Sequence, residues 1–564
     1  MRSRVSLYCF AGLAILLCSW GMVARAIRPP AASLRVITWH NDNAHTGQYL
    51  RETALTPLNV NSGSFGKLGS YTVDGQIYAQ PLYWPGLPIP HLGTHNVLFV
   101  ATENDSVYAL DADTPGSQPL WQVNFTNPPN VTTVPCEDIN KSCHVYPIVG
   151  ITGTPVIDPS SKTLYVIART KEIRLTQGVY VQRLHALDIA THAEKFGGPV
   201  EITASQSGIS FDPLHAGQRP GLLLLPGSQG GNNVLYIAWA GYTHSGPPIL
   251  PGWVMAYDAQ TLKQLAVFAT TPKGTDGGVW GAGGGIASDS RGYLYAATAD
   301  GTFDANKGGA DYGDSLVKLN LSHAALSVTD YFTPMDEACR LQADLDLGSG
   351  GPMVLPHDGS ATVTDEVLIS GKGGSPCDLF SGTYASPIYV VNRRRMGQFH
   401  GQHDNVAQTV AGATAGYWSA PAYWKGQNGA YVYYAGVLED ADKGVGDNLR
   451  MYTLSGGLLS TSSVAQSPNT FPVGSTPSVS ANGDTNGIVW AIERQDSLSQ
   501  KPGSQPAVLH AYDATNVATE LYNSKQAGTR DQAGPATKYQ VPTIANGRVY
   551  VGTQTELDAY GLMK

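Results

Sequence analysis

Few polar clusters in this sequence combine the residue types and the spacing of a catalytic or metal-binding motif. Residues 400–404, HGQHD, offer two imidazoles and a carboxylate, which are ligands that zinc accepts. They follow a run of arginines in a polar stretch and lack a second ligand cluster, so we interpret them as a surface loop. Residues 304–308 are similar to the start of a calcium-binding loop, but no glutamate stands at its closing position. The sequence has no Gly-x-Ser-x-Gly elbow, no Walker loop and no His-Glu-x-x-His motif.

The N-terminus predicts export. An apolar run over residues 5–23 follows two arginines, and Ala24-Arg25-Ala26 then offers the small-x-small pattern that signal peptidase recognises. We therefore expect residues 1–26 to be a signal peptide. No later apolar stretch approaches the roughly 20 residues that a membrane-spanning helix needs. The sequence thus predicts an exported protein, periplasmic or extracellular, without a membrane span.

The remaining cysteines predict structural disulfides. Removing the signal peptide leaves Cys136, Cys143, Cys339 and Cys377 in a compartment where disulfides persist. A bond from Cys136 to Cys143 would close a short loop and leave Cys339 to pair with Cys377, although the sequence does not fix the pairing. The spacings match neither a zinc site nor the Cys-x-x-Cys of a redox pair or a haem attachment site.

Composition favours a large β protein that does not bind nucleic acid. The chain has 564 residues, of which 42% are hydrophobic and 14% charged, so it has ample material for a core. Its 64 glycines and 36 prolines are spread along the whole length, which is typical of many short elements joined by tight turns. A net charge of −9, with no run of Lys or Arg longer than the three arginines at 393–395, provides no positive field for a phosphate backbone.

A hairpin pattern recurs along the chain. In residues 97–123, VLFVATENDSVYALDADTPGSQPLWQV, apolar and polar residues alternate on both sides of a turn at Asn104 and Asp105. Eight loose copies occur, each preceded by a run punctuated by Gly or Pro, and the runs are spaced by about 55 to 75 residues. This spacing suits four strands and a loop. We therefore predict an all-β fold, an eight-bladed β-propeller of four-stranded antiparallel blades.

The predicted ring needs a closing strand. The last repeat, from Tyr539 onward, has room for only three strands, whereas residues 64–75 resemble the outer fourth strand of the other repeats. We expect this N-terminal strand to join the C-terminal blade, which would remove two open sheet edges. The alternative is a free N-terminal arm. On this interpretation residues 27–63 are an N-terminal segment and residues 64–564 are the propeller.

The repeat resembles that of the quinoproteins. Residues 107–112, VYALDA, followed by Gly116 and Trp121, are similar to the quinoprotein repeat, and residues 38–60 look like the segment that opens pyrroloquinoline quinone (PQQ) dehydrogenases. The resemblance covers nearly the whole mature chain. It implies the propeller fold strongly and a function less strongly, because the same fold serves dehydrogenases and non-catalytic assembly scaffolds.

Three stretches match the functional residues of quinoprotein alcohol dehydrogenases in part. Such an enzyme needs a hard cation held by oxygen ligands, a base for the substrate hydroxyl and a donor on the quinone oxygens. The resemblance implies Asp300 as a calcium ligand, in the place of an asparagine. It implies Asp314 as the catalytic base and Lys372 as the residue that contacts the quinone.

Other stretches depart from the pattern. The loop before residues 252–258 lacks the calcium-binding glutamate, and its nearest polar residues are His244 and Ser245. Ile286 replaces the tryptophan on which the quinone rests, which leaves Trp280 as the nearby aromatic candidate. No two cysteines are adjacent, so the family's disulfide over the cofactor is absent. These losses remove a negative ligand and a stacking surface.

Each candidate also has a purely structural interpretation. Asp300 and Asp314 suit turns at strand ends. Lys372 suits a solvated glycine-rich turn. Trp280 and Trp121 suit packing between blades.

We therefore weigh two functions. The favoured hypothesis is an exported scaffold that binds a small molecule or a protein on the propeller axis or rim, with a degenerate quinone site and no cofactor. The alternative is a dehydrogenase of alcohols or sugars that uses Ca²⁺ and PQQ and passes electrons to an external acceptor. A hydrolase or lyase acting on glycans finds no support, because no paired carboxylates can be placed together from the sequence.

Overall fold

The structure is a computed structural model that describes most of the chain after residue 33. The described residues are 1, 34–139, 145–227, 230–241, 250–357, 365–373, 386–413, 418–437, 446–495 and 503–563. The predicted signal peptide beyond residue 1, Cys143, Cys377, His244 and Ser245 lie outside them. Helices are few and short. They are η1 (Trp39–Asn41), α1 (Cys136–Ile139), η3 (Gly281–Gly283), η4 (Ala305–Lys307), α2 (Glu337–Ala343), η5 (Leu347–Ser349) and η7 (Gly528–Asp531).

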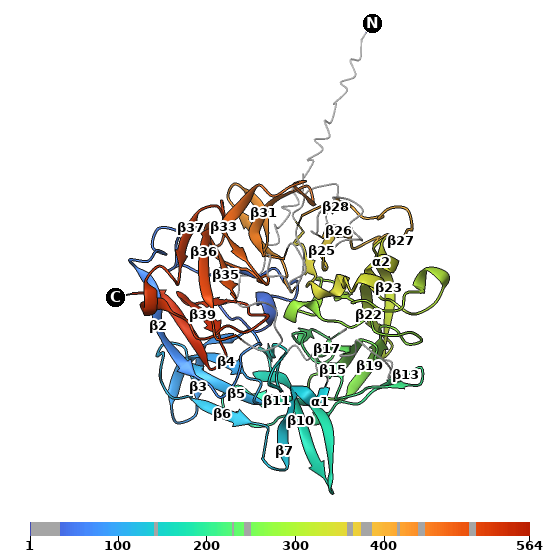
Figure 1. The fold of residues 1–564 in the computed structure, drawn as a ribbon, viewed down its shortest axis with the longest axis horizontal. Coiled ribbons are helices and arrows are strands. Elements are labelled where there is room, and N and C mark those ends of the chain that lie inside the picture. The colour runs from blue at the N-terminus through green and yellow to red at the C-terminus, as the bar shows by residue number, and fades with distance from the viewer. Residues whose placement is uncertain are drawn as a thin grey trace. The chain divides into compact units, whose positions relative to one another are not determined.

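Eight small antiparallel sheets form the blades of a propeller (Figure 1), which confirms the predicted fold class. Their strands run outward from the axis in chain order. Blade 1 is β3 (Leu82–Ile89), β4 (Gly93–Ala101), β5 (Ser106–Asp111) and β6 (Trp121–Asn124). Blade 2 is β9 (Val156–Asp158), β10 (Thr163–Arg174), β11 (Gln177–Asp188) and β12 (Val200–Glu201). Blade 3 is β16 (Leu223–Leu225), β17 (Val234–Gly241), β18 (Trp253–Asp258) and β19 (Gln264–Ala269).

The next four blades repeat this order. Blade 4 is β20 (Ile286–Ser288), β21 (Leu294–Ala297), β22 (Leu316–Ser322) and β23 (Ala325–Thr333). Blade 5 is β24 (Met353–Val354), β25 (Glu366–Ile369), β26 (Ile388–Asn392) and β28 (Gln408–Val410). Blade 6 is β29 (Ala422–Gly426), β30 (Gly429–Tyr434), β31 (Asp447–Ser455) and β33 (Ala465–Phe471). Blade 7 is β34 (Ser478–Asn482), β35 (Thr485–Glu493), β36 (Val508–Asp513) and β37 (Glu520–Asn523).

An N-terminal strand completes the last blade. Blade 8 is β38 (Thr543–Ala545), β39 (Arg548–Gly552), β40 (Glu556–Leu562) and β2 (Phe65–Thr72). β2 pairs antiparallel with β40, with Phe65 opposite Leu562 and Thr72 opposite Glu556. This is the pairing that the sequence predicts, and it joins the two ends of the ring through backbone hydrogen bonds.

Other short strands lie outside the four strands named for each blade. They are β7 (Val131–Pro135), β8 (Ile148–Val149), β13 (Ser205–Gln206), β14 (Ile209–Ser210), β15 (Ala216–Gly217), β27 (Gln398–Phe399) and β32 (Leu458–Leu459). β7 pairs with the outer half of β10, so the long hairpin of β10 and β11 has support beyond its own blade.

The segment before β2 runs along the innermost strands of the blades, and Figure 1 shows blue ribbon near the centre of the ring. An innermost strand has one edge turned to the axis, where its backbone groups need partners. The N-terminal segment supplies them, and β1 (Gln48–Tyr49) runs parallel to β34. Contacts to blades 1 to 7 join Val36 to Tyr83, Ile37 to Ile157, Asn43 to Leu224 and Ser288, Ala44 to Val354, Thr46 to Tyr423, and Gly47 to Val479.

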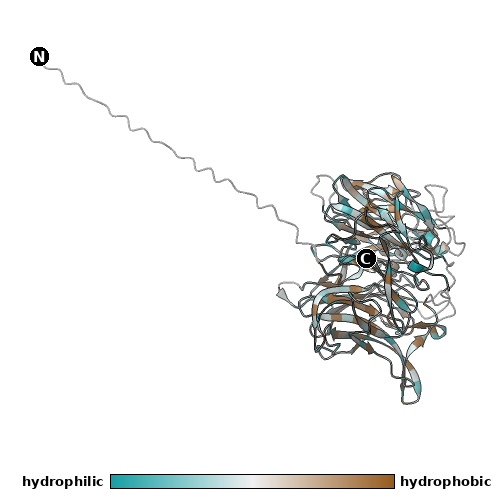
Figure 2. Ribbon diagram, turned by 90° about the vertical axis from the view of Figure 1, so that its left-hand side faces the viewer, coloured by the Kyte–Doolittle hydropathy of each residue, from teal (hydrophilic) through white to brown (hydrophobic). Residues whose placement is uncertain are grey.

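The core lies between neighbouring blades. Figure 2 shows apolar and polar residues mixed along the strands, as the period-two pattern predicts, and the apolar ones face the adjacent blade. Trp121 illustrates the rule. It packs in the apolar cluster between blades 1 and 2, and its indole Nε1 donates to the carbonyl of Ile189 at 3.1 Å. Trp121 is therefore a packing residue.

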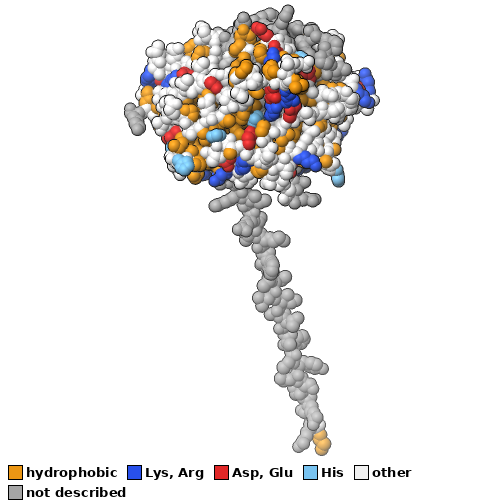
Figure 3. Space-filling model, turned by 90° about the horizontal axis from the view of Figure 1, so that it is seen from below, with side chains coloured by type: hydrophobic (Ala, Val, Ile, Leu, Met, Phe, Trp, Pro, Cys, Tyr) orange, Lys and Arg blue, Asp and Glu red, His pale blue; other side chains and the backbone are white. Residues whose placement is uncertain are grey.

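The surface and the helices agree with the composition. On the face in Figure 3, acidic and basic side chains are interspersed with apolar ones. Within the described part of the chain, every helix is too short or too polar to cross a membrane.

Other sequence candidates take structural positions. His400 and His403 are exposed, and the Asp404 carboxylate accepts the backbone N–H of Met335 at 2.8 Å, so this segment is a surface loop. Cys136 and Cys339 lie within the described residues, and their disulfides stay a prediction. Their expected partners lie outside the described residues, so the pairing stays a prediction.

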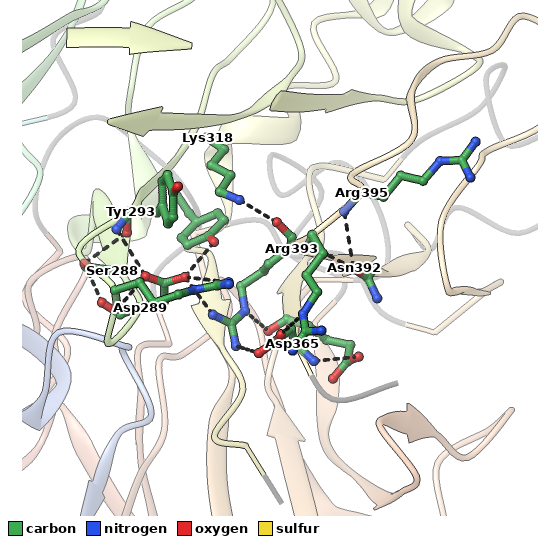
Figure 4. Close-up of polar contacts among 12 residues, drawn as sticks. Ser288, Asp289, Tyr293, Lys318, Asp365, Asn392, Arg393 and Arg395 are labelled. Carbon is green, nitrogen blue, oxygen red and sulfur yellow. Dashed lines mark hydrogen bonds and ion pairs between the residues drawn. The ribbon is translucent and has the colours of Figure 1, made fainter. Parts of the chain in front are cut away.

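A buried ion-pair network joins blades 4 and 5 at one end of their strands (Figure 4). Arg393 reaches Asp289 at 2.9 Å and Asp365 at 3.2 Å. The hydroxyl of Tyr295 donates to Asp289 at 3.0 Å, and the ammonium of Lys318 donates to the carbonyl of Arg393 at 2.7 Å. Each buried charge in this network therefore has an opposite charge or a hydrogen-bond partner.

Candidate functional site

The three residues that the family resemblance singles out lie at the same end of blades 4 and 5. Asp300 follows the end of β21, and Asp314 precedes the start of β22. Because these strands are antiparallel, the two positions share one end of blade 4. Lys372 follows the end of β25, which is the corresponding strand of blade 5. The fold thus brings together residues that are far apart in sequence.

Two further aspartates complete the cluster. The carboxylate oxygens of Asp300, Asp344 and Asp346 come within 4.8 Å of one another. The Lys372 ammonium lies 2.6 Å from Asp346 and 2.8 Å from Asp344. The backbone N–H of Asp300 donates to the other oxygen of Asp346 at 3.0 Å. Asp346 is thus the central acceptor of the site.

Asp314 is buried beside this cluster. Its side chain is 0% exposed, and its backbone φ of 43° is in the left-handed region. Oδ1 accepts the N–H of Leu347 at 2.8 Å. Oδ2 is buried and makes no hydrogen bond to any described residue. The carboxyl group is therefore held inside the protein rather than presented to a substrate.

Burial and mutual repulsion set the protonation of these acids. Burial, followed by the charge of Asp346, raises the pKa of Asp300. The same two causes raise the pKa of Asp314 well above its usual range. Burial also acts to raise the pKa of Asp346, but the ammonium of Lys372 and hydrogen bonds outweigh it, so that pKa falls. In this structure Asp346 is the ionised partner of Lys372, and Asp300 and Asp314 hold protons more readily.

The segment between blades 4 and 5 positions Asp344 and Asp346. Arg340 of α2 is buried and pairs with Asp336 at 2.8 Å. The same guanidinium lies 3.4 Å from the carbonyls of Leu345 and Lys372. Arg340 therefore links α2 to the segment that carries Asp344 and Asp346 and to the turn that carries Lys372.

Trp280 contacts an arginine through its ring face. The guanidinium of Arg219 lies 4.3 Å from the ring centroid of Trp280 and 4.3 Å from that of Tyr539. Arg219 is 3% exposed. Ile286, at the position where the resemblance implies a tryptophan, packs in the apolar core between blades 3 and 4. The indole of Trp39 lies against Gly284, where an added Cβ would come within 2.5 Å of the ring.

A small polar pocket opens among blades 6, 7 and 8. Lys538 lies over the ring of Trp418 at 5.0 Å, and the amide group of Gln540 is buried without a hydrogen-bond partner among the described residues. The pocket is lined by Trp418, Val473, Gly474, Ser475, Thr476, Ile492, Arg494, Thr537, Lys538, Tyr539 and Gln540. This lining suits a polar group placed beside an aromatic ring.

The sequence interpretation missed Asp344, Asp346 and Arg219. Asp344 and Asp346 lie in a non-repeating segment, so no repeat position pointed to them. The available signal was a pair of aspartates, two residues apart, just before the innermost strand of a blade. Arg219 immediately precedes a Pro-Gly turn at the corresponding place in blade 3, and nothing in its local sequence indicates a contact with Trp280.

The comparisons with known proteins show the fold. No family model matches the chain, and no curated protein matches it. Among solved structures, a quinohemoprotein alcohol dehydrogenase, ADHIIG from Pseudomonas putida HK5, is similar at 12% identity with a TM-score of 0.54. The match covers 94% of this chain and 80% of that one. A Dos1 propeller matches at 10% identity with a TM-score of 0.37, over 78% of this chain and 95% of that one. The chain thus has the eight-bladed propeller fold of the quinoprotein alcohol dehydrogenases.

Proposed function

We propose that this protein is an exported propeller that binds a small molecule or a protein on its axis or rim, with a degenerate quinone site. The observation that carries the proposal is the position of Arg219. A flat quinone needs a free aromatic face on which to stack. The guanidinium of Arg219 packs on both Trp280 and Tyr539, so it covers the aromatic face that the sequence offers.

The position of Asp314 also supports this proposal. A general base must come within hydrogen-bonding reach of the proton that it removes. Asp314 is 0% exposed, one of its oxygens accepts the Leu347 N–H, and its raised pKa favours the protonated form. Asp314 is therefore not placed to act as the base of a quinone-dependent reaction.

A second function is favoured by a different observation. Asp300, Asp314 and Lys372 meet in one cluster, as a calcium- and PQQ-dependent dehydrogenase of alcohols or sugars would require. One of the similar solved structures is named a quinohemoprotein alcohol dehydrogenase. In that case Lys372 would have to leave Asp346 to reach a quinone, and Asp314 would have to become accessible. An external acceptor would take the electrons.

A titration separates the two functions. Purified, metal-stripped mature protein is mixed with PQQ, with and without Ca²⁺, and binding is followed by tryptophan fluorescence and calorimetry. We expect no saturable binding of PQQ. Saturable, calcium-dependent binding at one site would replace our proposal with the dehydrogenase. The next step in that case is an Asp314→Ala variant, whose dye-linked oxidation should collapse.

A further inference from the structure

We infer that the pocket among blades 6, 7 and 8 binds the hydroxyl and carboxylate groups of a small hydroxy acid. Its walls come from turns that lie far apart in the sequence. Residues 473–476 precede β34, residues 537–540 precede β38, and Arg494 follows β35. The inference rests on the proposed function, because it names the class of small molecule that the propeller would bind.

Gln540 is the residue that indicates a ligand. Its side chain lines the pocket and is 8% exposed, and neither Oε1 nor Nε2 forms a hydrogen bond to any described residue. A buried amide with both groups unsatisfied destabilises a fold, and native proteins seldom keep one without a reason. A ligand that offers one acceptor and one donor would satisfy both atoms.

The charge of the lining selects the acceptor. Arg494 and Lys538 are 3% and 5% exposed, and the described lining contains no Asp or Glu. A cavity lined by charges of one sign attracts a ligand of the opposite sign. A carboxylate accepts hydrogen bonds from a guanidinium, an ammonium and an amide, so it suits Arg494, Lys538 and the Nε2 of Gln540 together.

The same charge selects the donor that the Oε1 of Gln540 needs. An ammonium on the ligand would lie among the cations of the lining, without a described carboxylate there to compensate it. A hydroxyl donates to Gln540 and adds no charge. A hydroxyl beside a carboxylate therefore fits the pocket better than an amino acid does.

Two aromatic residues of the lining support a binding role. Trp418 and Tyr539 pack edge to face with their ring centroids 5.4 Å apart. Their backbone φ angles are 53° and 61°, in the left-handed region that bulky side chains seldom adopt. Such conformations cluster at ligand-binding sites, where the surrounding structure holds them.

The test uses four matched two-carbon compounds. Mature protein at pH 7 is titrated by calorimetry with glycolate, acetate, which lacks the hydroxyl, glycine, which replaces it with an ammonium, and ethylene glycol, which lacks the carboxylate. We expect saturable binding of glycolate at one site, about tenfold tighter than that of acetate or glycine, and no binding of ethylene glycol. Absence of glycolate binding, or equal binding of glycolate and acetate, would overturn the inference.

The PQQ titration remains a separate test. If neither glycolate nor PQQ binds, only the hydroxy acid inference fails. If PQQ binds in the calcium-dependent way described above, the proposed function fails.

Three variants assign the pocket. Lys538→Met keeps the stem but removes a charge, so glycolate and acetate should both bind about tenfold more weakly. Gln540→Leu removes the amide, so glycolate should bind no more tightly than acetate does. The control is Lys263→Met, at an exposed position before β19, which should bind glycolate as the unchanged protein does.

The ratio of glycolate to acetate affinity decides the outcome even if Lys538→Met fails to fold. A preference for glycolate that survives in Gln540→Leu would contradict the site, because a structural role for Gln540 would not change that ratio.

Discussion

The charges at the two ends of β21 and β25 differ: they are paired at one end and mostly acidic at the other. At one end Arg393, Lys318 and their neighbours surround Asp289 and Asp365, and each carboxylate has a cation within 3.2 Å. At the other end, the carboxyl groups of Asp300, Asp314, Asp344 and Asp346 have one ammonium among the described residues, that of Lys372. The same pair of blades is thus joined by a balanced network at one end and by an excess of acid at the other. A buried contact that holds two blades together requires paired charges, whereas an excess of carboxyl groups is typical of a binding site.

The largest expected effect comes from breaking the balanced end. Arg393→Met removes the nearer of the two arginines that pair with Asp289, whose side chain is only 1% exposed, and leaves Arg291 at 3.4 Å. Removing one partner of a buried ion pair leaves the other poorly compensated, and Arg291 is 46% exposed and replaces only part of the lost charge. We therefore expect a loss of about 3 kcal/mol in the free energy of unfolding. Urea denaturation measures it.

The matched control is the neighbouring Arg394, which also bonds to Asp365 but is 67% exposed. Arg394→Met should change stability by about 0.5 kcal/mol or less. Equal losses of stability in the two variants would show that burial does not determine how much these ion pairs contribute to stability.

Acid tests a third environment, the inner edge of the ring, where the buried imidazoles of His40 and His45 form no ion pair with a described carboxylate. Burial lowers the pKa of His40 to about 4 and that of His45 to about 3. The unfolded chain then binds protons that the folded chain cannot, so stability is complete above pH 6.5 and falls as the pH drops toward 4. We expect up to about 3 kcal/mol from His40. Thermal unfolding between pH 7 and pH 4 measures the loss.

A His40→Gln variant checks the source of this loss. The amide can still donate to the carbonyl of Pro477, which His40 Nε2 contacts at 2.8 Å, but it cannot be protonated. The variant should lose less stability on acidification than the protein with His40. An identical pH profile would assign the acid sensitivity elsewhere.

A smaller effect is expected at the stacked arginine. Arg219→Ala uncovers the ring faces of Trp280 and Tyr539 and removes two cation–π contacts, at a cost of about 1–2 kcal/mol. Acrylamide should quench tryptophan fluorescence more strongly in this variant. If quenching is unchanged, Arg219 does not shield the aromatic face, and the main argument against a quinone fails.

The smallest effect concerns salt. Asp344 is 58% exposed, so its pair with Lys372 is screened by ions, whereas the Asp289 pair is not. In metal-free protein, the stability lost in Asp344→Asn should shrink by a few tenths of a kcal/mol between low salt and about 1 M NaCl. The loss in Arg393→Met should stay the same. A large salt effect on Arg393→Met would mean that water reaches the network.

The repeat made most of the fold predictable. Alternating hairpins such as β4–β5 recur because every blade buries apolar side chains against its neighbours in the same way. Eight copies of the hairpin therefore predict eight blades. The incomplete last repeat likewise predicts that β2 pairs with β40. The N-terminal segment along the innermost strands was not predicted, because its partners are backbone groups that carry no sequence pattern.

The site was predictable only where it lies on the repeat. Asp300, Asp314 and Lys372 stand at strand ends, so the fold itself brings them together. Asp344 and Asp346 lie on the non-repeating segment that contains α2, and Arg219 reaches Trp280 through space rather than along the chain. Contacts of this kind depend on how blades are placed around the axis.

The N-terminal segment has a consequence for how the chain reaches its native state. The His40 ring contacts the carbonyl of Pro477, 437 residues further along the chain, and β2 needs β40. The first part of the protein to be synthesised therefore cannot find its partners until nearly all of the rest has been made. Such long-range closure slows folding. It also leaves the innermost strands without the backbone partners of the N-terminal segment until the last blades have been made.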